Sequence, residues 1–267
     1  MTIQCLENRT LLAAAFTEFV DPNPSANNGF GTEVVPLSTG NVVVTAPFDD
    51  AGGVDAGAVY LFNGATGELI STLTGSRDFD AVGKGPNSIV PLTNGNYLVV
   101  SRGWNNGSIV AAGAVTFADG LTGISGIVSD QNSLVGASES DNLGFYPETE
   151  IFPLPTGDYV VSNPRASNMG VRGAGSVTHG DGVHGISGVV SAINSLMGTR
   201  RQDAFNEIVV LANGDYISIR PYWDSPTVPD AGAITRFDGE TGIDGLRQCH
   251  EQSGGIANGN IPGSDGH

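Results

Sequence analysis

The chain has 267 residues, a formal net charge of −17 at pH 7 and 39 glycines. Such an acidic chain repels polyanions, so nucleic acids and anionic membranes are poor partners, and no apolar run is long enough for a membrane span. With 15% charged and 39% hydrophobic residues, the composition predicts many short strands and tight turns around a core.

Near the N-terminus, residues 6–13 read Leu-Glu-Asn-Arg-Thr-Leu-Leu-Ala. This stretch resembles the LEPRxLL motif found near the start of many planctomycete-type surface and secreted proteins, with Asn8 where proline is common. The resemblance implies export, so we expect an extracellular or cell-surface protein with a leader over residues 1–15. Cys5 and Cys249 lie at opposite ends and form no Cys-x-x-Cys motif, so neither a zinc site nor a redox motif is indicated.

Three glycine anchors recur four times along the chain. A turn glycine is followed by an Ala-Gly-Ala/Ser tripeptide and, ten residues later, by a third glycine, at Gly40, Gly57 and Gly67; Gly95, Gly113 and Gly123; Gly157, Gly175 and Gly185; Gly214, Gly232 and Gly242. The copies are offset by 55 to 62 residues. This periodicity predicts repeats at about 29–75, 83–136, 144–198 and 205–246, within one domain over residues 16–246.

Each copy is expected to contain four strands, a to d, with a glycine turn between a and b and an Asn-Gly or Asp-Gly turn between c and d. Strand d is expected at residues 68–73, 124–128 and 186–190. The fold class we predict is all-β, with four repeated four-stranded antiparallel blades in a β-propeller-like array. A β-solenoid usually has shorter repeats, and a sandwich would not need such regular periodicity.

The first copy also resembles the FG-GAP repeat of integrin-α-type propellers. The resemblance rests on Phe30-Gly31, Ala46-Pro47 and the run from Gly57 to Phe62. That family often carries an Asp-x-Asp-x-Asp-Gly calcium loop between its first two strands, but residues 38–41 form only a short hairpin here. The resemblance therefore implies calcium binding for no residue of this chain.

The fourth copy lacks a clear strand d, and residues 247–267 form a Gly/Asn/Ser-rich stretch that we expect to be a disordered tail. Residues 15–20 form a spare β-prone segment before the first copy. We predict that this segment pairs with the outer edge of the fourth blade and protects it. The chain is also compatible with being part of a longer repeat protein.

The loops between strands b and c carry the candidate ligand-binding residues. Trp104 and Trp223 each follow their turn glycine by nine residues, so they occupy equivalent positions. The candidate set combines aromatic, amide and carboxylate groups: Phe48, Asp49, Trp104, Asn105, Tyr222, Trp223 and Asp224. Such groups on one face suit a sugar ring or a peptide. The alternative is that the tryptophans complete the core at the blade edges.

A second candidate site is a carboxylate cluster. Glu33, Glu150 and Glu207 share one position of strand a, where the remaining copy has Ser88. If strand a is innermost, the three acids converge and a cation such as calcium would relieve their repulsion, unless a solvated channel leaves them unpaired.

His179, Asp181 and His184 also look like a metal cluster. However, Asp181 occupies the turn position of Asn63, Asp119 and Asp238, so we interpret it as a turn residue.

The sequence contains no Gly-x-Ser-x-Gly elbow, P-loop or dinucleotide fingerprint, so we predict no enzyme activity and no cofactor. The function we predict is that of an exported binding or adhesion module that recognises a glycan or a protein through its blade loops. Two alternatives stay open. One is a carbohydrate-active enzyme with carboxylates from several blades, and the other is a purely structural repeat.

Overall fold

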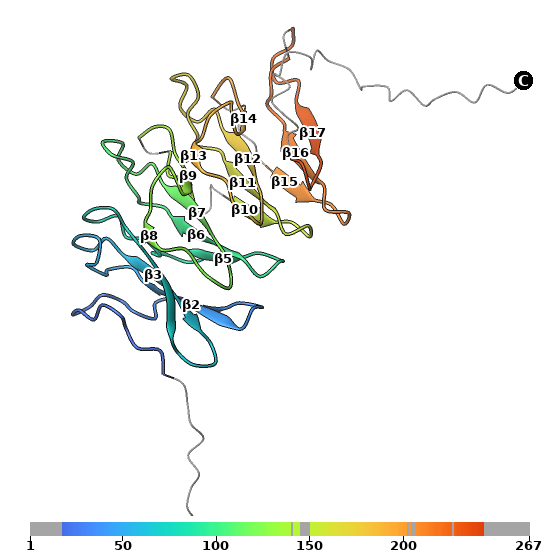
Figure 1. Cartoon of the computed structure of the whole chain (residues 1–267). Helices are drawn as coiled ribbons and strands as arrows, with labels where there is room; N and C mark the ends of the chain where they lie inside the picture. The colour runs from blue at the N-terminus through green and yellow to red at the C-terminus, as the bar shows by residue number, and fades with distance from the viewer. Residues whose placement is uncertain are drawn as a thin grey trace, which may run out of the picture.

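The computed structural model describes residues 18–139, 141–144, 150–201, 203, 207–225 and 227–242. Within these residues every regular element is a β-strand. Figure 1 shows four sheets that stand side by side in chain order, from the blue N-terminal sheet to the orange C-terminal one. The predictions of an all-β fold and of four repeated units are confirmed.

We number the sheets 1 to 4 in this order. Sheet 1 contains β1 (Val34–Pro36), β2 (Asn41–Ala46), β3 (Ala58–Asn63), β4 (Leu69–Thr74) and β8 (Gly126–Ile127). Sheet 2 contains β5 (Ile89–Pro91), β6 (Tyr97–Ser101), β7 (Ala114–Ala118), β9 (Ser133–Val135) and β13 (Gly188–Val189). Sheet 3 contains β10 (Glu150–Pro153), β11 (Tyr159–Asn163), β12 (Ser176–Gly180) and β14 (Leu196–Met197). The described strands of sheet 4 are β15 (Glu207–Val210), β16 (Tyr216–Arg220) and β17 (Ala233–Phe237).

The first three strands of every sheet form an antiparallel meander. Valine, isoleucine and tyrosine dominate its second strand, since β-branched and aromatic side chains pack well on a pleated sheet. The a–b turn that leads into this strand needs a residue with positive φ. Gly40 has φ 89° and Gly157 has φ 102°, a region that residues with a Cβ enter only with strain.

The predicted fourth strands of sheets 2 and 3 are wrong in their partners. Residues 126–127, within the predicted strand d of the second copy, form β8 and pair in parallel with β4 of sheet 1. Residues 188–189 form β13 and pair in parallel with β9 of sheet 2. The true fourth strands are β9 and β14, which pair with the third strands of their own sheets.

Chain length explains this exchange. The segment from Gly123 to Gly136 is five residues longer than its counterpart from Gly67 to Gly75. The extra residues let the chain first run along the outer edge of the preceding sheet and then return to its own. Each such crossing covers an edge that would otherwise expose unpaired backbone groups.

The sheets are held together by apolar side chains that alternate between two faces. We call the face toward the preceding sheet the front face and the face toward the next sheet the back face. Tyr97 and Val99 of β6 lie in the core between sheets 1 and 2, whereas Leu98 lies between sheets 2 and 3. A third core joins sheets 3 and 4 and includes Val160 and Tyr216. The alternation follows from the two-residue period of a strand.

The N-terminal segment covers the front face of sheet 1. The ring of Phe19 lies 5.4 Å from that of Phe62, and Phe30 contacts both Tyr60 and Phe62. Residues 18–20 are not in a strand. The predicted pairing of residues 15–20 with the fourth blade is therefore wrong for Phe19, because its ring packs on the apolar face of sheet 1, at the opposite end of the array from sheet 4 (Figure 1). Residues 15–17 lie outside the described part.

A buried aspartate recurs in the d–a loops, and in the first two of these loops it links two sheets. Asp80 is fully buried, and its Oδ2 accepts hydrogen bonds from the backbone N–H groups of Ser76 and Arg77 at 2.8 and 3.1 Å. Its Oδ1 accepts from the backbone and the side-chain amide of Asn105, in the b–c loop of the next repeat. The same contacts recur at Asp141, which binds Ala137, Ser138 and Ser167. Asp203 likewise accepts from Thr199 and Arg200.

The opposite edge carries a second set of links. Thr39, Asn94 and Thr156, in the a–b turns, donate to the carbonyl oxygens of Gly120, Gly182 and Gly239 in the c–d turn of the next sheet, at 2.9, 2.7 and 3.0 Å. The c–d turn positions require glycine for a steric reason. A Cβ on Gly120 would lie 1.9 Å from the carbonyl oxygen of Gly95.

We predict that Asp80→Ala lowers the free energy of unfolding by about 3 kcal/mol, because it leaves several buried donors without an acceptor. Glu139→Ala is the control, since Glu139 is an exposed carboxylate in the next d–a loop and its loss should change stability by less than about 0.5 kcal/mol. Urea denaturation of both variants measures the difference. Equal effects would contradict the role given to Asp80.

Candidate functional site

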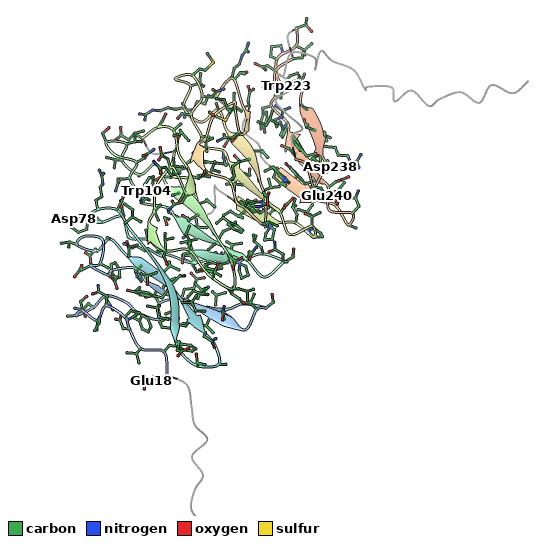
Figure 2. The ribbon with its side chains drawn as sticks, viewed as in Figure 1. Glu18, Asp78, Trp104, Trp223, Asp238 and Glu240 are labelled. Atoms are coloured by element: carbon green, nitrogen blue, oxygen red, sulfur yellow. The ribbon has the colours of Figure 1, made fainter. Side chains whose placement is uncertain are left out.

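The b–c and d–a loops lie on one edge of the array, and the a–b and c–d turns lie on the other. Figure 2 shows Asp78, Trp104 and Trp223 along the loop edge, whereas Asp238 and Glu240 lie at the other end of the strands. The predicted ligand-binding residues therefore share one edge. Their burial and contacts decide which of them a partner can reach.

Trp104 belongs to the core. Its side chain is only 3% exposed, and its Nε1–H donates a 3.1 Å hydrogen bond to the hydroxyl of Ser76 in the preceding repeat. The neighbouring Asn105 is buried against Asp80. Trp104 is therefore a core residue, which was the alternative to a role in binding. Its indole is not available for stacking on a ligand.

Asp49 is also a structural residue. Its carboxylate is fully buried and accepts hydrogen bonds from the hydroxyl of Tyr60 at 2.6 Å and from the side-chain amide of Asn23 at 2.8 Å. Burial, and secondly the hydrogen bond to Asp49, raise the pKa of Tyr60, so the phenol stays protonated and keeps donating. Asp49 thus fixes the first b–c loop instead of meeting a ligand.

The remaining predicted residues are exposed or partly buried, and they do not form one pocket. The ring of Phe48, in sheet 1, lies 5.1 Å from the ammonium group of Lys84. Tyr222, Trp223 and Asp224 are in sheet 4, at the opposite end of the array (Figure 1). Tyr222 is 55% exposed, and Asp224 pairs with Arg200 and accepts from the backbone of Asp230. The structure does not bring Phe48 together with these three residues.

The predicted carboxylate cluster is not formed. The carboxylate of Glu33 accepts hydrogen bonds from the backbone and hydroxyl of Ser88, at 3.1 and 2.5 Å, while Glu150 and Glu207 are exposed. Among the described residues, no group of three or more His, Cys, Asp or Glu side chains could hold a metal ion. Strand a of sheet 1 and strand a of sheet 2 do lie in contact at their beginnings, as the hypothesis required. At this contact Glu33 meets Ser88, however, and not a second carboxylate.

The turn interpretation of Asp181 is confirmed. Its Oδ1 accepts from the backbone N–H groups of Val183 and His184, as Asp119 and Asp238 do in their own turns. His184 pairs with the same aspartate at 3.0 Å. His179 lies elsewhere, with Nε2 3.3 Å from Asp158.

His179 is part of the contact between sheets 3 and 4. Its ring stacks on that of Tyr216 with a centroid distance of 6.0 Å and an interplanar angle of 9°. Burial lowers the pKa of His179, and the negative charges of Asp158, Asp181 and Asp238 oppose this shift without cancelling it. The equivalent position in sheet 2 holds Phe117, and the position of Asp158 holds an asparagine there.

Four exposed side chains on the loop edge are absent from the predicted binding set. They are Val54, Val110, Met169 and Val228, one from the b–c loop of each repeat, and they are 54%, 52%, 97% and 53% exposed. We call these four side chains the tip row. The signal is a valine three or four residues before the tripeptide glycine in every copy, but in the third copy this valine, Val171, is partly buried and Met169 is exposed instead.

Two grooves lie between sheets 2 and 3. The larger has a volume of about 400 Å³ and is lined by Arg102, Glu150, Phe152 and apolar residues of β5. The guanidinium of Arg102 donates to the carbonyl oxygens of Lys84 and Pro86, and burial lowers its pKa. Arg102 thus fixes the d–a loop in front of this groove. The smaller groove, about 340 Å³, is lined by Asp119, Gln131, Asn132 and His184 on the outer side.

We predict that Trp104→Ala lowers the free energy of unfolding by about 3–5 kcal/mol, as expected for a large buried aromatic side chain. Tyr222→Ala is the matched control, because Tyr222 is exposed in an equivalent loop and should cost less than about 0.5 kcal/mol. Guanidinium denaturation compares the two variants. A mild effect of Trp104→Ala would show that the indole is accessible after all.

We also predict that stability falls with acidification between about pH 7.5 and pH 5 because of His179. Since burial lowers its pKa in the folded protein, the unfolded chain binds the proton more tightly, and stability is lost as pH falls through the unfolded pKa. The double variant Asp158→Asn/His179→Phe copies the corresponding pair of sheet 2. Its midpoint of urea unfolding should depend less on pH over this range. An unchanged slope would contradict the assignment to His179.

The comparisons with known proteins agree with this architecture. The family model described as "Repeat of unknown function (DUF5650)" matches residues 36–84, 91–145, 153–207 and 210–247. Each matched segment starts between five and nine residues after the corresponding predicted repeat. Among curated proteins, no match to the chain is found. Because the four matched segments cover more than half of the residues, the chain belongs to the DUF5650 repeat family.

Proposed function

We propose that the chain is a non-catalytic protein-binding module that contacts its partner through the tip row. The observation that carries this proposal is the recurrence of an exposed aliphatic side chain at the same loop in all four repeats. A row of solvent-exposed apolar groups on one edge is a liability for solubility unless it meets a partner. Four successive sheets spread the contacts along an extended line instead of a single pocket.

The tips are held in fixed conformations, which favours binding. In sheet 2, the backbone groups of Asn106 and Ile109 exchange two hydrogen bonds of 3.0 and 2.9 Å, and Asn168 and Val171 do the same in sheet 3. In sheet 4, Ser225 donates to the carbonyl oxygen of Val228. Loops that are already ordered lose little conformational entropy when a partner binds.

A protein partner fits the accessible groups better than a glycan does. Recognition of a sugar ring relies on stacking against an exposed aromatic face, and Trp104, the strongest candidate for that role, is buried. The exposed aromatic rings of Phe79 and Tyr222 belong to different sheets. Aliphatic tips spaced one per repeat are instead suited to the apolar patches of a protein surface.

The same proposal includes location and architecture. The resemblance of residues 6–12 to an export-associated motif supports an extracellular or surface location, although these residues lie outside the described part. The contact between Glu33 and Ser88, each directly before the first strand of its sheet, supports a propeller-like arrangement in which strand a is innermost. Among the described residues no helix has the length and apolarity needed to cross a membrane.

The test is to replace the whole tip row in one variant, Val54→Ser/Val110→Ser/Met169→Ser/Val228→Ser. The purified chain would be cross-linked to the cell-surface fraction of its native host and the captured proteins quantified. We expect the variant to lose capture of its specific partner by about tenfold or more, with an unchanged unfolding midpoint.

The control is Leu121→Ser/Val183→Ser, which removes two equally exposed side chains from the c–d turns on the opposite edge. This control should bind like the unaltered chain. An equal loss of binding in both variants would contradict a binding role for the tip row. Binding on a glycan array that survives all four substitutions would favour a glycan and another surface, and absence of any captured partner would favour a structural role.

A further inference from the structure

The back face of sheet 4 carries aliphatic side chains, and none of the described sheets covers it. Its side chains alternate with those that pack on sheet 3, and the aliphatic ones are Val209, Ile217, Ile219 and Ile234. None of the four is buried, and Ile234 is 70% exposed. An isoleucine that is exposed to this extent contributes little hydrophobic stabilisation to the folded chain.

In the three other sheets, the positions that correspond to Ile217 and Ile234 are buried. Val43 and Val59 of sheet 1, Leu98 and Val115 of sheet 2, and Val160 and Val177 of sheet 3 are all at most 2% exposed. In each case the front face of the following sheet covers them. The three interfaces between neighbouring sheets therefore indicate what kind of surface fits the back face of sheet 4.

The covering surface has constant features. Tyr97, Tyr159 and Tyr216 open the second strand of sheets 2, 3 and 4 and point their rings toward the preceding sheet. A glycine in the c–d turn offers its carbonyl oxygen to the a–b turn of that preceding sheet. In sheet 4 the equivalent donor is Asn213, whose amide is turned onto Asp215 within its own turn.

We propose that the back face of sheet 4 docks the front face of a further repeat of the same family, with a tyrosine at the start of its second strand. This would continue the interface that already joins sheets 1 to 4. A head-to-tail second copy does not provide such a face, because Phe19 and Phe30 cover the front of sheet 1. The occupant is therefore a repeat without that cover.

The experiment extends the full chain by one repeat of its own. A second copy of residues 186–242 is inserted after Gly242, so that the chain continues as it does after Gly185. The solvent exposure of isoleucine methyl groups is then measured by NMR with a soluble paramagnetic probe. We expect the Ile234 signal to become protected, and the midpoint of thermal unfolding to rise by about 5 °C.

Ile127, which is 54% exposed on β8 of sheet 1, is the internal reference and should keep its exposure. Ile234→Asp should cancel both the protection and the gain in stability in the extended chain, and should cost little in the unextended one. A second extension, with residues 124–185 inserted at the same place, guards against a failure of the first to fold.

If neither extension protects Ile234, the proposal is wrong. It is also wrong in its occupant if the unextended chain sediments as a dimer that Ile234→Asp dissociates, since a second copy would then cover the face. Neither outcome depends on the tip row, so this test and that of the proposed function can fail separately.

Discussion

Each sheet in this protein is apolar on both faces, and that constraint shapes the rest of the structure. Neighbours such as Tyr97 and Leu98 cannot share a face, because successive side chains of a strand point in opposite directions, and the two residues thus enter two different cores. A sheet of this kind gains stability only when it is covered twice, so the repeats depend on one another. The N-terminal phenylalanines cover the front face of sheet 1, which packs on no other sheet among the described residues.

The same dependence limits which loop residues are free to bind a partner. The b–c loops are fixed by buried carboxylates such as Asp80 and Asp49, and Trp104 fills the space between two repeats. These groups fix the base of the loops, and their contacts within the fold leave them unavailable to a partner. The tip row extends beyond this base, and the aromatic side chains that are exposed on the same edge, such as Phe79 and Tyr222, do not recur from repeat to repeat.

Local chemistry made much of this fold predictable. The conformations of turn glycines and turn aspartates such as Gly40 and Asp181 depend only on residues close in the sequence. The repeat count and the first three strands of each copy were therefore predictable. The parallel pairing of β8 with β4 was not, because the partner of a short strand is decided by chain length and neighbours in space. Trp104 and Trp223 are equivalent in sequence, yet the first is buried between two repeats and the second is only partly buried in the last one. Their position in the repeat does not encode this difference.

One position on the third strand differs between the repeats in a way that is compatible with the same interface between sheets. His179 and Arg236 occupy the same site on the third strands of sheets 3 and 4, and each faces an aspartate where the first two repeats have asparagine. A carboxylate at this place is thus accompanied by a cationic or protonatable partner, as its partial burial requires. His179 stacks on the tyrosine of the following sheet, and a guanidinium stacks on an aromatic ring at least as well as an imidazole does. Arg236 is therefore compatible with the same tyrosine-bearing face, although it is mostly exposed in sheet 4.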